Sequence, residues 1–66
     1  MMAQRIIVPP DMDGHRADKV VAVVLETSRA VARRAIDAGG VLLEGRPVGA
    51  SDRMVGGAHL DVELTE

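Results

Sequence analysis

The feature that most limits how this chain can fold is its complete lack of large, rigid core side chains. Its 66 residues include no Phe, Tyr, Trp or Cys. A chain of this length buries only about 60% of the surface that it exposes when unfolded, and without cysteine it has no disulfide to add stability. The sequence therefore predicts one small domain over residues 1–66, with a core of Val, Leu, Ile, Ala and Met.

Two segments in the first half of the chain have the apolar period of helices. The apolar arc of residues 16–26 consists of Ala17, Val20, Val21, Val24 and Leu25. Ser28 is a favourable N-cap for a second helix, which Gly39-Gly40 ends. The apolar arc of this second helix consists of Val31, Ala32, Ala35, Ile36 and Ala38. We expect both arcs to pack against the rest of the domain.

Short apolar runs predict strands on either side of the helices, over residues 5–8, 41–43, 47–48 and 59–64. In the last of these the alternation points Leu60, Val62 and Leu64 inward. The order is a strand, two helices and an antiparallel meander. The predicted fold class is therefore α+β, with two short helices packed on a small, mainly antiparallel sheet.

The charges divide the chain into two parts, although its formal net charge is only −2. Residues 14–36 contain five basic and two acidic side chains, a balance of +3, and the remainder contains three basic and eight acidic ones, a balance of −5. An uneven distribution of this kind creates a local positive field in an acidic protein.

Three of the arginines, Arg29, Arg33 and Arg34, lie on the polar arc of the second predicted helix, opposite its core face. Arginine binds phosphate bidentately, and a helix N-terminus adds partial positive charge. Arg16 and Lys19 extend the patch if the two helices lie side by side. The alternative interpretation is a solvated polar helix face. Asp18 is expected to pair with Arg29 or Arg16 and to orient it.

The segments GHRAD, SRAVARRAIDAGGVLLEGRPV and VGGAHLDV together resemble the RNA-binding domain named after ribosomal protein S-four. The resemblance covers residues 14–62 and needs no gap from Ser28 to Gly45. Within that family, two segments are most similar to the N-terminal domain of large-subunit-type ribosomal RNA pseudouridine synthases: the preceding QRIIVPPDMDGHRADKVV and the VGG before the last strand. Four residues depart from the family pattern: Ala17, Ala35, Glu44 and Ala58.

The resemblance implies the alpha-L motif, which is two helices against a short sheet, and it agrees with the fold class above. It implies an accessory domain that holds structured, ribosomal RNA and does no catalysis, with a catalytic domain following Glu66. The residues that it assigns to RNA binding are Arg16, Lys19, Arg29, Arg33, Arg34 and Arg46.

Nothing in the sequence predicts a catalytic, metal or cofactor site. His15 is expected to be a surface residue, and Asp18 is expected to have no substrate pocket around it. No set of nucleophile, base and oxyanion donor can be assembled from the sequence. Without aromatic side chains, RNA bases cannot stack on the protein. RNA contacts are therefore expected to go to phosphates and to duplex shape, with little base specificity.

Other classes of function remain open. A β-grasp sulfur carrier has a similar hairpin but ends in Gly-Gly, which this chain does not. A protein-interaction module that has lost RNA binding is favoured by the net acidity and by Glu44. No segment resembles a signal peptide or a membrane span, so a cytoplasmic location is expected. The oligomeric state is open, because exposed sheet edges could pair with a second copy.

Overall fold

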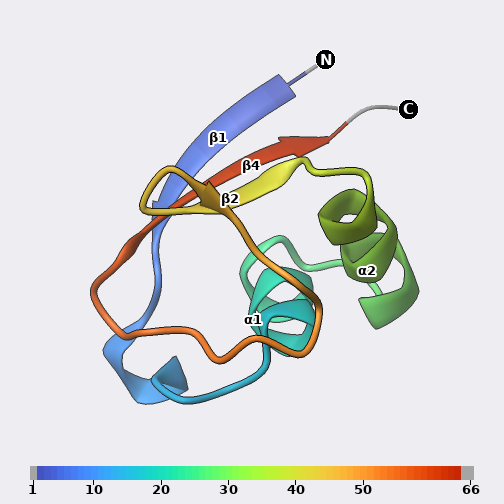
Figure 1. The fold of residues 1–66 in the computed structure, drawn as a ribbon. Helices are drawn as coiled ribbons and strands as arrows, with labels where there is room; N and C mark the ends of the chain where they lie inside the picture. The colour runs from blue at the N-terminus through green and yellow to red at the C-terminus, as the bar shows by residue number, and fades with distance from the viewer. Residues whose placement is uncertain (1, 65–66) are drawn as a thin grey trace.

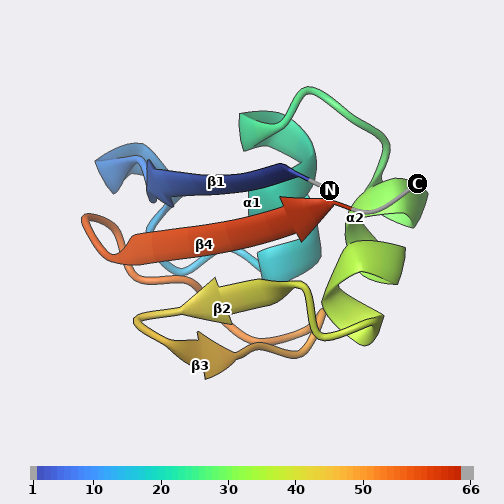
Figure 2. The same cartoon turned by 90° about the horizontal axis from the view of Figure 1, so that it is seen from above.

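The computed structural model describes residues 2–64, which form two helices and a short 3-10 turn beside one antiparallel sheet (Figure 1). The elements in chain order are β1 (Met2–Ile7), η1 (Pro10–Met12), α1 (Ala17–Val24), α2 (Arg29–Asp37), β2 (Val41–Leu43), β3 (Arg46–Pro47) and β4 (His59–Leu64). Both helices lie on the same face of the sheet (Figure 2). The predicted α+β class is confirmed.

The strand order is β1-β4-β2-β3, so the predicted meander is wrong. In a meander β4 would lie beside β3, but it lies between β1 and β2. Leu60 of β4 is therefore opposite Ile6 on one side and Leu43 on the other. The chain reaches this position through residues 48–58, which run back past the start of α1 before β4 begins.

The core lies between the helices and the inner face of the sheet, and it is aliphatic as predicted. Leu60 and Val62 of β4 are buried, whereas Asp61 between them points to the other face. The side chain of Leu64, also predicted to point inward, lies outside the described part of the structure. The buried apolar residues are Val8, Met12, Ala17, Val20, Val21, Ala22, Ala32, Ile36, Val41, Met54, Leu60 and Val62.

The helix ends follow from local chemistry. Ser28 caps α2 as predicted, because its hydroxyl accepts a hydrogen bond from the Val31 N–H at 3.1 Å. Gly39 ends the helix with a positive φ of 80°. A side chain at Gly40 would meet the Glu63 carbonyl oxygen at 2.6 Å. This close approach lets the Glu63 N–H donate to the Gly40 carbonyl and joins the end of α2 to β4.

The surface has few unusual apolar features. Val23 of α1 is 54% exposed, on the side of the helix away from the core. Within residues 2–64, no helix is long and apolar enough to cross a membrane.

Candidate nucleic-acid interface

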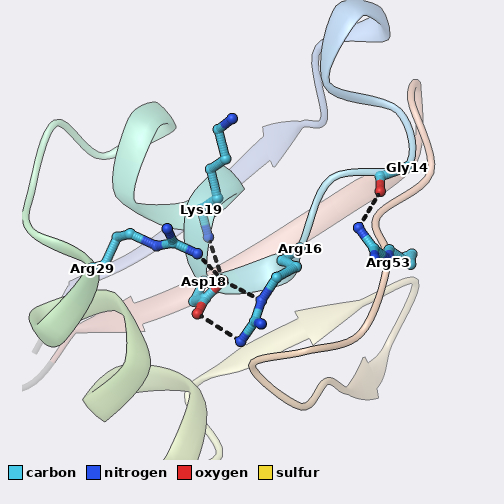
Figure 3. Close-up of polar contacts among 6 residues, drawn as sticks. All are labelled: Gly14, Arg16, Asp18, Lys19, Arg29 and Arg53. Atoms are coloured by element: carbon cyan, nitrogen blue, oxygen red, sulfur yellow. Dashed lines mark hydrogen bonds and ion pairs between the residues drawn. The ribbon is translucent and has the colours of Figure 1, made fainter.

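Asp18 lies at the centre of the basic region and accepts hydrogen bonds from two arginines (Figure 3). Its oxygen Oδ1 accepts from Arg29 Nη2 at 3.2 Å and from Arg16 Nε at 3.3 Å. Its other oxygen, Oδ2, accepts from Arg16 Nη2 at 3.3 Å. We call these three residues the Asp18 cluster. The prediction that Asp18 pairs with Arg16 or Arg29 is confirmed, and it pairs with both.

The positions of these residues in the helices explain why they meet. Arg16 is the N-cap of α1 and Arg29 is the first residue of α2, so each arginine stands at a helix start. Asp18 lies in the first turn of α1, where a carboxylate is favoured by the helix dipole. It also accepts a hydrogen bond from the Lys19 N–H at 2.8 Å. The cluster thus links the N-terminal ends of the two helices.

The environment of Asp18 keeps its carboxylate ionised. Burial acts to raise its pKa, but the hydrogen bonds and charges of Arg29 and Arg16 outweigh burial, and the pKa of Asp18 lies below its ordinary value. The Asp18 side chain is only 6% exposed, whereas those of Arg16 and Arg29 are 43% and 58% exposed. The acid is therefore hidden, and the two cations remain accessible to a ligand.

The cluster corrects one expectation about Arg29. The helical period places Arg29 on the polar arc, opposite the core face of the helix. However, Arg29 is seven residues, about two helical turns, before the buried Ile36, so it borders the side of α2 that faces inward. Its guanidinium reaches Asp18 on α1, and this contact gives Arg29 a role in joining the helices.

The remaining predicted cations of the helices are exposed. The side chain of Lys19 extends away from Asp18 (Figure 3). Arg33 is one turn along α2 from Arg29 and is exposed. Arg34 is exposed too, but consecutive helix residues are about 100° apart, so it faces a different direction from Arg33. We call these five cations the basic helix face: Arg16, Lys19, Arg29, Arg33 and Arg34.

Arg46 is not part of the Asp18 cluster. It is the first residue of β3, the edge strand of the sheet, and it follows the turn at Glu44-Gly45. Within residues 2–64 it makes no hydrogen bond to any residue of the basic helix face. The resemblance to a family was the only basis for including Arg46 in the predicted site.

Arg53 is a cation that the sequence reasoning missed. It forms an isolated antiparallel bridge with Arg16, and its Nη1 donates to the Gly14 carbonyl at 3.1 Å. The loop before it binds the start of α1, because the carbonyls of Asp52 and Ala50 accept hydrogen bonds from the first N–H groups of that helix. No local sequence signal links Arg53 to Arg16, since the two are far apart along the chain.

The two helix starts consequently differ in what they offer to an anion. The protein itself occupies the first N–H groups of α1. At the start of α2, the N–H groups of Arg29 and Ala30 meet no protein acceptor among the described residues. Free N–H groups beside an arginine are favourable for a phosphate. Of the two helix starts, the start of α2 is thus the one whose N–H groups can bind an anion.

A different set of charged residues lies on the opposite face of the sheet. Arg5 and Asp61 are paired across β1 and β4, with Arg5 Nε 2.9 Å from Asp61 Oδ1. This hydrogen bond lowers the pKa of Asp61. Glu44, in the β2–β3 turn, accepts a hydrogen bond from the His59 N–H at 2.7 Å, which lowers the pKa of Glu44. We call Arg5, Ile7, His59 and Asp61 the outer sheet face.

Comparison with known proteins identifies the family. The S4 domain, named after ribosomal protein S-four, matches residues 16–59. An RNA pseudouridine synthase described as uncharacterized, from Mycobacterium bovis, is 44% identical over 66 residues, and so is one from Mycobacterium tuberculosis. Each alignment covers 98% of this chain but 21% of the relative, so the chain spans about a fifth of the length of these proteins. The chain belongs to the S4 domain family of RNA-binding domains.

Proposed function

We propose that this chain is the non-catalytic RNA-binding module of an RNA pseudouridine synthase, and that it holds structured, ribosomal RNA on its basic helix face. The observation that carries the proposal is the Asp18 cluster, which fixes two half-exposed guanidinium groups side by side at the starts of two helices. Guanidinium groups held in this way suit phosphate oxygens. On this proposal the protein works in the cytoplasm, where it meets ribosomal RNA.

The composition of the chain supports a mode of binding that reads phosphates and shape. With no aromatic residue, the chain has no side chain on which a base can stack. Contacts to phosphates carry no sequence information. The domain would therefore hold a duplex or a folded region of RNA, and the choice of uridine would belong to a catalytic domain elsewhere in a longer chain.

The greater length of the relatives is consistent with that division of labour. The relatives are named as RNA pseudouridine synthases, and this chain aligns with about a fifth of each. Within residues 2–64, no three His, Asp or Glu side chains lie together in a way that could hold a metal ion. Pseudouridine formation by the 66-residue chain alone would contradict the proposal of a non-catalytic module.

Fluorescence anisotropy with a labelled ribosomal RNA hairpin tests the proposal. With about four phosphate-contacting cations, the logarithm of the binding constant should fall with the logarithm of the salt concentration at a slope of about −3 to −4, by analogy with duplex DNA. Unlabelled duplexes of unrelated sequence should compete about equally. If the chain does not bind RNA at low salt, the proposal fails, and a protein-interaction module becomes the better interpretation.

A further inference from the structure

Asp18 presents an electrostatic problem for an RNA-binding surface. It is the only buried charged side chain among the residues whose burial is described, and it places a negative charge in the middle of the basic helix face. If only the total charge of the surface affected binding, Asp18 would weaken the attraction of RNA phosphates. A buried acid at this place is better explained by what it does to the two arginines that it holds.

We infer that Asp18 is a positioning residue, which holds Arg16 and Arg29 as a fixed dication that favours duplex RNA over flexible single strands. This inference rests on the proposed function and adds to it the kind of RNA that the site prefers. Asp18 itself need not touch RNA, because its side chain is buried beneath the two guanidinium groups that it orients.

The geometry limits how far the two cations can separate. Arg29 Nη2 and Arg16 Nε donate to the same Asp18 oxygen, at 3.2 and 3.3 Å, so these two nitrogens lie at most 6.5 Å apart. Two guanidinium groups this close repel one another unless an anion lies between them. Asp18 supplies that anion before RNA arrives, and so the pair is already assembled in the free protein.

The arginines keep donors for a phosphate while they stay bound to Asp18. Among the described residues, Arg16 Nη1 and both Nε and Nη1 of Arg29 have no acceptor. A long side chain that is already ordered loses less conformational freedom on binding than a free one. The benefit is largest for a duplex, whose phosphates are themselves fixed, because a flexible single strand can adapt equally well to arginines that move.

A pair of matched substitutions separates positioning from charge. Asp18→Asn and Asp61→Asn each raise the net charge by one, and each removes a carboxylate that pairs with arginine. Asp61 belongs to the outer sheet face, where it pairs with Arg5. The helices lie on the other face of the sheet (Figure 2). The asparagine at position 18 would turn an NH2 group toward one of the arginine donors and release that arginine.

The binding of both variants is measured by fluorescence anisotropy, with a labelled 16-base-pair RNA duplex and one of its single strands. We expect Asp18→Asn to bind the duplex about 3- to 10-fold more weakly than the wild type, with a smaller change for the single strand. Asp61→Asn should bind both as the wild type does, or slightly more tightly. If Asp18→Asn binds the duplex as tightly as Asp61→Asn, the inference is wrong, although the proposed function stands. A wild type that binds neither RNA would instead contradict the proposed function.

A second pair of variants keeps the test valid if Asp18→Asn does not fold, which circular dichroism at the binding temperature would reveal. Arg29→Lys and Arg33→Lys preserve charge, but of these two arginines only Arg29 donates to Asp18, through Nη2 of its planar guanidinium group. Arg29→Lys should lose part of the preference for duplex, whereas Arg33→Lys should keep it. Equal preferences in the two lysine variants would overturn the inference.

Discussion

The Asp18 cluster and the Arg5–Asp61 pair use the same two residue types in opposite settings. Asp18 is 6% exposed and holds two arginines from different helices, whereas Asp61 is 35% exposed and holds one arginine from the neighbouring strand. The difference predicts that the effect of an arginine-paired acid on stability depends on how deeply the acid is buried. A buried carboxylate links and orients elements, while an exposed pair contributes little because water screens it.

The largest expected effect is the difference in the free energy of unfolding between substitutions on the inner and outer faces of the sheet. Leu60 on the inner face of β4 is fully buried, so Leu60→Ala should lower the free energy of unfolding by about 2–5 kcal/mol, enough to unfold much of so small a domain. Ile7 on the outer face is 58% exposed, and Ile7→Ala should change that free energy by less than about 0.5 kcal/mol. Urea denaturation followed by circular dichroism measures both, and similar losses would mean that the outer face is covered.

Substitution of single arginines should sharpen the comparison between RNA binding and stability. Arg29→Ala and Arg33→Ala should each weaken duplex binding severalfold at low salt and reduce the salt slope by about 1. Only Arg29→Ala should also lower the melting temperature, by several degrees, because it removes one of the two arginines that pair with the buried Asp18.

Arg5→Ala is the control for these two variants, because Arg5 lies on the outer sheet face and pairs with Asp61. It should leave RNA affinity and the salt slope unchanged. If Arg5→Ala weakens binding as much as Arg33→Ala does, the basic helix face is not where RNA binds. A melting temperature that is unchanged in Arg29→Ala would show that the Asp18 cluster does not stabilise the fold.

Acid should reduce the stability contributed by the Asp18 cluster more than the stability contributed by the Arg5–Asp61 pair. The pKa of Asp18 is lowered in the folded state, so the unfolded chain binds more protons between that pKa and the ordinary pKa of about 4. The stability that Asp18 contributes is therefore present above about pH 4 and is lost as the pH falls through its lowered pKa. In urea denaturation between pH 2 and pH 5, Asp18→Asn should lose less stability than the wild type does.

Asp61→Asn provides the matched comparison in acid, since the hydrogen bond from Arg5 also lowers the pKa of Asp61. The stability that Asp61→Asn loses in acid should be close to the loss in the wild type. The loss in Asp18→Asn should depart further from the wild-type value, because Asp61 is more exposed than Asp18. The opposite order would show that burial does not decide which of the two acids matters more.

The smallest effect is expected in the β2–β3 turn. Glu44 has a positive φ of 49°, which asparagine adopts more readily, but its carboxylate also accepts the His59 N–H. Glu44→Asn should change the melting temperature by only a few degrees, because these two effects oppose each other. It should not alter duplex affinity, as the Glu44 carboxylate is turned to His59. A severalfold gain in affinity would place this turn at the RNA surface.

The sequence by itself determined the local features of this protein. Ser28 predicts the start of α2 and Gly39 its end, because capping and left-handed turns depend on neighbouring residues. The alternation in β4 predicts which of its residues are buried, since successive side chains of a strand face opposite ways. The aliphatic core follows from a composition that offers nothing larger.

Only the tertiary structure decided how distant segments meet. The helical period placed Arg29 on the polar arc of α2. The packing of α1 against α2 brought it to Asp18, eleven residues away along the chain. The insertion of β4 between β1 and β2, and the return of Arg53 to Arg16, are equally non-local. Residue periodicity records which side of one element is apolar, whereas the partners of that side depend on how all the elements pack around one core.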